Sequence, residues 1–396
     1  METTDAFAGV ECVDCGHAQA GTASGRCPEC GGIFDPTYDR ADRSLDPGDL
    51  SDRSFASMWR YRELLPFERR GAVTLDEGGT RLVECPALAE EMGVGRVLVK
   101  DEGENPTGGL EDRGASLAIT AARGDGASDV ALSSTGNGGQ AVAAYAARAG
   151  LDAHVFVPSR GNFANKAMVN VHGADMNVVG GRIGDARSAY ERALDERGDW
   201  HPVGAFDTPY SHEGTKTILY EVVDQLDWSV PDAVVCPTAD GELLAGLSKA
   251  ATELRQPGLV EDRPALYAAQ AAGCDPIVAA FEAGRDRPEA HDNPDTICGE
   301  LEVPDPAGGH LAVEAIRESD GGAVAVEDDD ALEAAVAVAG RAGLGADVAC
   351  GVAAAGAWEL ARWGEFDADD TVVLVNSGTA NREADVLRSH LMGKGI

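Results

Sequence analysis

The sequence predicts an α/β protein with two domains, in which parallel sheets are flanked by helices, and with a small cysteine-rich segment at the N-terminus. From about residue 71 onward, short apolar segments alternate with amphipathic ones, which is the pattern of parallel strands joined by helices. The chain has 396 residues, of which 44% are hydrophobic, so it is long enough for two packed domains and an appendage.

The N-terminal segment contains two C-x-x-C pairs, "CVDCGH" and "CPECGG". A glycine follows each pair and permits a tight turn, so four thiolates can surround one ion tetrahedrally. The alternative is a pair of redox dithiols, but a redox motif normally adjoins a βαβ unit. We therefore expect a structural zinc ribbon over residues 1–36, with Cys12, Cys15, Cys27 and Cys30 as ligands. The metal would stabilise a segment too small to bury its own core.

The remaining chain divides into a linker and two α/β domains. Residues 37–70 are polar and then aromatic, and we expect a linker with a short helix that docks on the body. Residues 71–105 and 206–396 are predicted to form the larger α/β domain, and residues 106–205 the smaller one. The cleft is expected between these two domains.

Four glycine-bearing stretches follow predicted strands, in the order "NPTGGLEDRG", "SSTGNGGQ", "CPTADGELLAG" and "NSGTANRE". The strands themselves are predicted at "RVLVKDE", "DVALSS", "AHVFVP", "ADMNVVGG", "DAVVCP", "ALYAAQ" and "TVVLVNSG". In parallel sheets, ligands bind at the carboxyl ends of strands, near helix N-termini. One such stretch is weak evidence for a ligand site, whereas four in this order are strong evidence.

The charge is strongly acidic, with 68 Asp and Glu against 32 Lys and Arg and a net charge of −36. The acids are dispersed along the chain, a pattern that resembles proteins of extreme halophiles. This balance argues against nucleic acid as a partner, because few cations are left to neutralise phosphates. No apolar run approaches the ~18 residues of a membrane span, and no basic-then-apolar leader opens the chain. A cytoplasmic location is the default expectation, with no membrane partner.

Taken together, the motifs resemble the threonine synthase family and, more broadly, the tryptophan-synthase-β-like (fold type II) enzymes that use pyridoxal phosphate. The resemblance runs from the zinc knuckles to "TVVLVNSG" and covers nearly the whole chain. It implies a fold type II architecture, pyridoxal phosphate as cofactor, an amino-acid-like ligand and a homodimer.

The first family motif reads N-P-T-G-S-F-K-D-R, and its lysine forms an imine with the cofactor aldehyde. Here Glu111 stands at the lysine position, and Gly109 and Leu110 replace the Ser and Phe. The matching positions are Asn105, Pro106, Thr107, Gly108, Asp112 and Arg113. A carboxylate can neither form an imine nor act as the amine base of this chemistry.

Two further positions carry over from the family. The second motif, S-S-G-N-x-A, appears as "SSTGNGG", and its Asn, which would bind the cofactor's phenolate oxygen, falls on Asn137. The last motif places a Ser or Thr beside the pyridine nitrogen, which falls on Ser377.

The third motif departs from the family pattern. The family has a Gly/Asn-rich loop whose N–H groups hold the cofactor phosphate ahead of a helix. In this chain the phosphate loop (residues 239–242) reads Ala-Asp-Gly-Glu, and only Gly241 fits. If Asp240 and Glu242 are ionised and face the phosphate, each costs several kcal/mol at an effective dielectric of ~20. The sequence does not fix where these carboxylates point.

Three hypotheses of function follow. The first is a threonine synthase-like protein that has lost imine chemistry and acts as a small-molecule binder or as the partner of an active relative. The second is an active pyridoxal-phosphate-dependent lyase of the threonine synthase or serine/threonine dehydratase type, which performs β/γ-elimination or replacement on an amino acid or O-phosphohomoserine. The third is an interaction protein that works through its zinc ribbon.

The lysines distinguish the first two hypotheses. None of the five lysines sits in a glycine-rich turn at a strand end, so none replaces the missing amine; they are Lys100, Lys166, Lys216, Lys249 and Lys394. Residue 111 and the phosphate loop therefore favour the first hypothesis, with either a homodimer or a heterodimer with an active relative.

Overall fold

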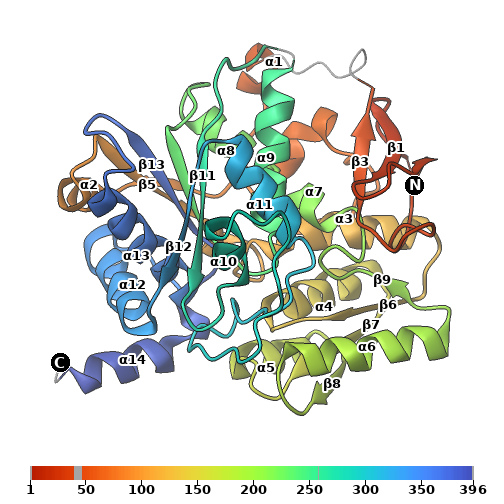
Figure 1. Ribbon diagram of the computed structural model, residues 1–396. Helices are drawn as coiled ribbons and strands as arrows, with labels where there is room; N and C mark the ends of the chain where they lie inside the picture. Colours follow the sequence, from red (N-terminus) through yellow and green to blue (C-terminus); the bar gives the residue numbers. More distant parts are fainter. Residues whose placement is uncertain (1, 40–46, 257, 395–396) are drawn as a thin grey trace. The chain divides into compact units, whose positions relative to one another are not determined.

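The computed structural model describes residues 2–39, 47–256 and 258–394. The chain separates into two compact units (Figure 1). Unit 1 comprises Met1–Gly79, Glu111–Glu221 and Gln256–Leu259, and unit 2 comprises Thr80–Leu110, Val222–Arg255 and Val260–Ile396. Each unit contains a largely parallel sheet with helices packed on it, which confirms the predicted α/β class.

The sheet of unit 1 has four parallel strands in the order β8-β7-β6-β9. Its central strands are buried, which explains their continuous apolar sequence. Helices α3 and α4 cover one face and α6 covers the other (Figure 1). The bounds are β6 Asp129–Ser133, β7 Asp152–Pro158, β8 Asp175–Val179, β9 His201–Pro202, α3 Glu111–Gly124, α4 Asn137–Ala149, α5 Phe163–Val171, α6 Ile183–Arg197 and α7 Ser211–Thr215.

The N-terminal part of unit 1 is a three-stranded antiparallel sheet in the order β2-β1-β3. Its own apolar cluster is small and includes two of the cysteines. The bounds are β1 Phe7–Cys12, β2 Ala18–Ala20 and β3 Phe34–Tyr38. The short helices α1 (Pro47–Ser51) and η1 (Met58–Leu64) follow it.

The sheet of unit 2 has six strands in the order β12-β11-β10-β13-β5-β4. All neighbours are parallel except β4, which runs antiparallel to β5. Helices α2, α12 and α13 lie on one side of it and α9 and α11 on the other (Figure 1). The strands are β4 Leu82–Glu84, β5 Arg96–Asp101, β10 Ala233–Pro237, β11 Ala265–Ala271, β12 Ala323–Val326 and β13 Thr371–Asn376.

The helices of unit 2 lie between its strands or at the C-terminus. They are α2 Pro86–Met92, η2 Glu102–Glu104, α9 Glu242–Arg255, α10 Pro276–Glu282, α11 Gly309–Glu318, α12 Asp328–Ala342, α13 Val348–Trp363, η3 Ala380–Arg382 and α14 Ala384–Gly393. Helix α8 (Thr217–Gln225) carries the chain from unit 1 into unit 2.

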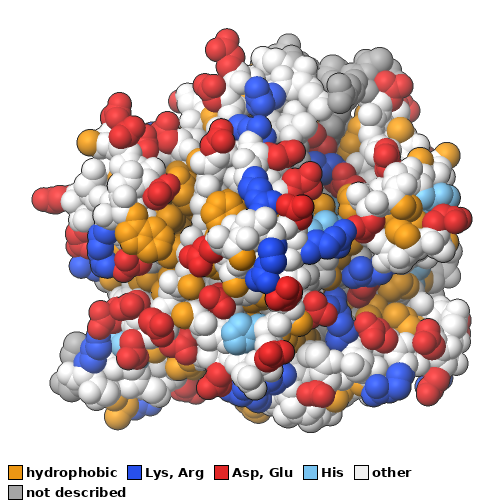
Figure 2. Space-filling view, viewed as in Figure 1, with side chains coloured by type: hydrophobic (Ala, Val, Ile, Leu, Met, Phe, Trp, Pro, Cys, Tyr) orange, Lys and Arg blue, Asp and Glu red, His pale blue; other side chains and the backbone are white. Residues whose placement is uncertain are grey.

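The domain boundaries predicted from the sequence remain a prediction, and they differ in places from the division into two units. Strand β3 runs to Tyr38, past the expected end of the ribbon. Residues 206–221 cluster with unit 1 rather than with the segments 222–255 and 260–396 of unit 2. Residues 40–46 of the predicted linker lie outside the described residues. Among the described residues, no helix is both long and apolar enough to cross a membrane. Acidic side chains are scattered over the face shown in Figure 2, interspersed with basic ones.

Candidate ligand and metal sites

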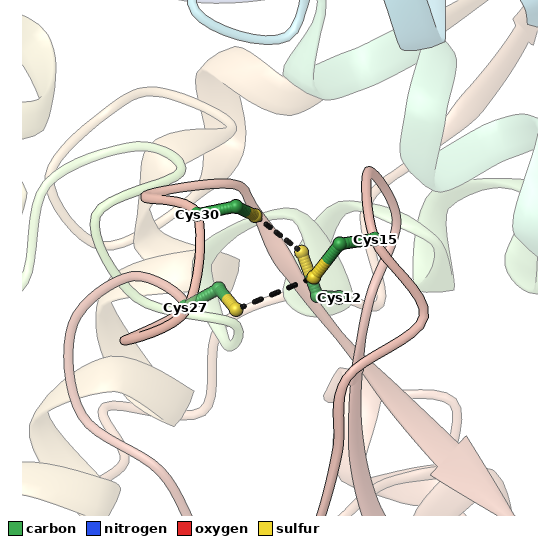
Figure 3. A group of neighbouring side chains, drawn as sticks. All are labelled: Cys12, Cys15, Cys27 and Cys30. Carbon is green, nitrogen blue, oxygen red and sulfur yellow. Dashed lines mark hydrogen bonds between the residues drawn. The ribbon is translucent and has the colours of Figure 1, made fainter.

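The four N-terminal cysteines converge on one point, as their spacing predicts. Their sulfur atoms all lie within 4.8 Å of one another and face inward from two turns (Figure 3). The Sγ–Sγ distances are 3.5 Å for Cys12–Cys30 and 3.7 Å for Cys15–Cys27. Zn–S bonds of about 2.3 Å in a tetrahedron place sulfurs ~3.8 Å apart, so the arrangement fits zinc.

The ribbon docks on helix α7 through buried and partly buried polar contacts. The carboxylate of Asp35 lies 2.9 Å from Nε2 of His212. Glu213 accepts hydrogen bonds from Tyr38 and Lys216, and the side chains of Glu213 and Lys216 are fully buried. Sequence analysis did not find these contacts, because about 175 residues separate the partners. The ribbon is therefore anchored to the body of unit 1.

Glu111 is the first residue of α3 and is half-buried. The backbone of α3 that follows Glu111 is held by contacts of Arg113. The guanidinium of Arg113 makes two hydrogen bonds to Glu221, at 2.6 and 2.9 Å, and both side chains are fully buried. A Cβ on Gly214 of α7 would collide with the Arg113 carbonyl, so α7 and α3 pack backbone against backbone. Residue 111 therefore occupies a fixed position at the start of a rigid helix.

Four of the five lysines make contacts with residues outside α3. Lys100, fully buried on β5, donates to Thr80 O at 2.8 Å and to Gln225 Oε1 at 3.0 Å. Lys216 belongs to the cluster with Glu213, and Lys166 donates to Ser159 O at 2.8 Å. Lys394 pairs with Glu333, and Lys249 is half-buried within α9. The contacts given for Lys100, Lys166, Lys216 and Lys394 are with residues outside α3.

Asn137 is the first residue of α4 and is 3% exposed. Its Oδ1 accepts a hydrogen bond from Nδ2 of the buried Asn165, which leaves the NH₂ group of Asn137 as its donor to a ligand. Ser134 Oγ accepts from the N–H groups of Gly136 and Gly139, at 3.0 and 2.9 Å, and so orders the preceding turn. The predicted role of Asn137 toward an anionic oxygen is compatible with this geometry and stays a prediction.

The phosphate loop shows the orientation that the sequence left open. Oδ1 of Asp240 accepts a hydrogen bond from the backbone N–H of Glu242 at 3.2 Å. This is a donor at the start of α9, where the family holds a phosphate. Gly241 adopts φ of 96°, which glycine tolerates best. The Asp240 carboxylate thus turns back onto its own helix.

Ser377 follows β13 and is 7% exposed. Its Oγ lies 3.3 Å from Oδ2 of Asp347, whose Oδ1 accepts from Cys350 N at 2.6 Å and caps α13. Burial, reinforced by nearby carboxylates, raises the pKa of Asp347 well above its usual range. Leu110, the residue before Glu111, donates its N–H to Ser377 O at 3.0 Å. Asp347 therefore lies directly beside Ser377, although its sequence stretch is more typical of a helix core than of a site.

Comparison with known proteins identifies the family. The model of the family described as pyridoxal-phosphate dependent enzyme matches residues 73–378. The chain belongs to this family. It is 34% identical over 371 residues to a threonine synthase of Methanosarcina acetivorans, covering 93% of this chain and 91% of that protein. It is 32% identical over 378 residues to a threonine synthase of Methanocaldococcus jannaschii, covering 94% and 93%.

Solved structures agree on the fold. A fungal L-serine ammonia-lyase from Rhizomucor miehei superposes with a TM-score of 0.68 at 23% identity, covering 78% of this chain and 97% of that one. A maize serine racemase superposes with a TM-score of 0.66 at 20% identity, covering 80% and 94%. The predicted fold type II architecture is confirmed, and the chain is a threonine synthase-like member of the family.

The family implies pyridoxal phosphate, but the residues present do not fit its imine-bound form. The position at which the family supplies the amine carries Glu111, and the amines of Lys100 and Lys216 hold other contacts. At the helix that should receive the phosphate, Asp240 already accepts from Glu242 N. Residue 111 therefore offers no amine to the cofactor, and one backbone N–H at the start of α9 already has an acceptor within the chain.

Proposed function

We propose that this chain is a threonine synthase-like protein that has lost imine chemistry and binds an amino-acid-like small molecule, alone or as the partner of an active relative. The observation that carries the proposal is Glu111 at the start of α3, in a backbone fixed by the buried Arg113–Glu221 pair. A carboxylate has no nucleophilic amine, so Glu111 cannot form the imine on which the family's chemistry depends.

The same residues suit noncovalent binding. A carboxylate at residue 111 is a hydrogen-bond acceptor for a ligand's ammonium group, and the NH₂ group of Asn137 is a donor for an anionic oxygen. An amino-acid zwitterion carries both groups. The proposed role of these residues is to bind and orient such a ligand, without proton transfer from an amine.

The second candidate is an active pyridoxal-phosphate-dependent lyase that acts on an amino acid or O-phosphohomoserine. The comparisons favour this candidate, because both archaeal relatives are named threonine synthase and align over more than nine-tenths of the chain. An active enzyme would need an imine-forming amine from a position that the family does not use. The burial of Lys100 and Lys216 and their hydrogen bonds oppose that requirement.

The third candidate, a protein that acts through its zinc ribbon, has less support. The ribbon face formed by Asp35 and Tyr38 is already used for docking on α7, which favours a structural role for the metal site. A homodimer, or a heterodimer with an active relative, is proposed from the family, as is a role in amino-acid metabolism in the cytoplasm.

Activity and binding assays separate the first two candidates. The protein, purified in molar KCl, is incubated with pyridoxal phosphate and O-phosphohomoserine, and then with serine or threonine, while threonine, oxo-acid and phosphate are measured. We expect no turnover above a heat-inactivated sample and measurable heat of binding for at least one amino acid. Turnover that survives purification to homogeneity would support the second candidate and overturn the proposal.

A further inference from the structure

The ribbon and the start of α3, which carries Glu111, both belong to unit 1, and one segment of the chain contacts both. We call residues 207–216, which include α7, the bridging segment. Residues 208–216 of this segment are all buried, so packing rather than hydration fixes its position. Helix α7 lies beside both β3 and α3 (Figure 1).

The ribbon holds the bridging segment from one side through the loop before the second cysteine pair. Ala23 N donates a hydrogen bond of 3.2 Å to Oη of the buried Tyr210. Nε of Arg26 lies 3.2 Å from Oδ1 of Asp207. Arg26 directly precedes the predicted metal ligand Cys27. A metal ion that fixes Cys27 therefore also fixes the end of this loop against the bridging segment.

The ribbon holds the bridging segment from a second side through β3. This strand pairs with β1, whose last residue is the predicted ligand Cys12. The carboxylate of Asp35 on β3 lies 2.9 Å from Nε2 of His212 on α7, which is almost fully buried. The hydroxyl of Tyr38, at the end of β3, donates to the fully buried carboxylate of Glu213. Both contacts depend on β3 staying paired with β1.

The bridging segment in turn rests on the first turns of α3, backbone against backbone. A Cβ on Gly114 would lie 2.7 Å from Ser211 O, and a Cβ on Gly214 would collide with the carbonyl of Arg113. Glycine at both positions permits this close approach. Backbone atoms in direct contact leave little slack, so a displacement of the bridging segment changes the packing of the turn that carries Glu111.

We propose that the ribbon is a metal-dependent clamp, in which bound zinc keeps β3 and the loop before Cys27 on the bridging segment and thereby orders the start of α3. The ribbon's own apolar cluster is small, so the metal supplies much of the free energy that folds the ribbon. Without zinc, β3 releases His212 and Glu213, and the bridging segment opens locally.

The clamp regulates whatever binds at the start of α3. Because coupling between two sites is reciprocal, a ligand held beside residue 111 also tightens the hold of the ribbon on zinc. This control of ligand binding rests on the proposed function. The clamp itself is a property of unit 1 and is tested without a ligand.

Hydrogen exchange followed by mass spectrometry tests the clamp in the full-length protein. The zinc-loaded protein, with its metal content measured, is compared in molar KCl with the same protein after removal of the metal by a chelator. We expect metal removal to accelerate exchange at least tenfold in residues 7–38, in the bridging segment and in residues 111–116. Exchange in β7, a central strand of unit 1, and in α12 of unit 2 should change less than twofold.

A matched pair of variants tests the route of the coupling in the zinc-loaded state. Tyr38→Phe removes the hydroxyl that donates to Glu213 but keeps the ring beside Lys216. It should accelerate exchange in the bridging segment and in residues 111–116 at least threefold while the chain still holds one zinc ion. Thr22→Ala removes an exposed hydrogen bond from the ribbon to Asp125, outside the bridging segment, and should leave exchange there unchanged.

Four results would overturn the clamp. They are a chain that binds no zinc, exchange in the bridging segment and residues 111–116 that does not respond to metal removal, acceleration that extends equally to β7 and α12, and a Tyr38→Phe variant that behaves like Thr22→Ala. The proposed function fails separately, because imine formation and turnover refute it and the exchange measurement records neither.

Discussion

The buried cluster that anchors the ribbon provides the sharpest test of the packing in unit 1, through Lys216→Met. In the structure, the amine of Lys216 contacts Glu213 and lies 3.3 Å from Tyr38 Oη and 4.5 Å from the centre of the Tyr38 ring. Methionine keeps most of the volume but leaves the fully buried carboxylate of Glu213 without its cation. Breaking a buried pair in this way costs about 3–5 kcal/mol.

The assay is thermal unfolding in molar KCl, followed by circular dichroism, for Lys216→Met, Glu213→Leu and the double variant. At about 2–4 °C per kcal/mol, each single change should lower Tm by on the order of 10 °C. The double variant should lose less than either single one, because it leaves no unpaired buried charge.

A matched control is the surface pair Arg96–Glu84, whose side chains are 44% and 51% exposed. Arg96→Met should cost no more than about 1 kcal/mol. If the two single changes in the buried cluster are as mild as this control, or if their costs simply add in the double variant, the cluster is not a coupled ion pair and the reasoning fails.

Three further predictions concern other parts of the fold. Removing the metal with a chelator, or replacing Cys30 by Ser, should make residues 7–38 sensitive to limited proteolysis while unit 2 stays resistant. The reason is that the ribbon's own apolar cluster is small. Equal resistance with and without chelator would exclude a structural metal. Glu221→Gln should cost about 3–5 kcal/mol in the unfolding free energy, because it leaves the buried Arg113 without its counter-charge; a cost below 1 kcal/mol would show the pair to be dispensable. Burial raises the pKa of Asp347, so the folded protein keeps a proton on this carboxyl group that the unfolded chain releases at about pH 4. The contribution of Asp347 to the unfolding free energy should therefore fall as the pH rises from about 4. Urea titrations from pH 4 to 7 should show a shallower fall in unfolding free energy for Asp347→Asn than for the wild type, and parallel profiles would contradict the assignment.

The sequence predicted those features that depend on short-range spacing. Two C-x-x-C pairs identified the four cysteines that the structure brings within 4.8 Å of one another. Alternating apolar segments predicted the parallel sheets, and helices begin at or beside Glu111, Asn137 and Gly241 as expected. The short edge strand β12, "AVAV", was not identified, because four apolar residues fit a strand and a helix equally well.

Contacts between distant segments were not predictable from one sequence. His212 meets Asp35 across 177 residues, and Asp347 meets Ser377 across 30. The direction of the Asp240 carboxylate was open as well, because a loop carboxylate can face solvent, a ligand or its own helix. Only the folded backbone around Gly241 shows that it faces the helix.

The central claim is that residue 111 closes imine chemistry in this chain, and an optical measurement tests it most directly. Wild-type protein in molar KCl is mixed with pyridoxal phosphate, scanned for a visible imine band, treated with borohydride and digested. Glu111→Lys/Asp240→Asn/Glu242→Gln is the positive control, since it supplies the amine and removes both loop charges. We predict no stoichiometric band for the wild type, and for the control a band that borohydride fixes to the peptide containing residue 111. A wild-type band fixed at a single lysine peptide would contradict the account.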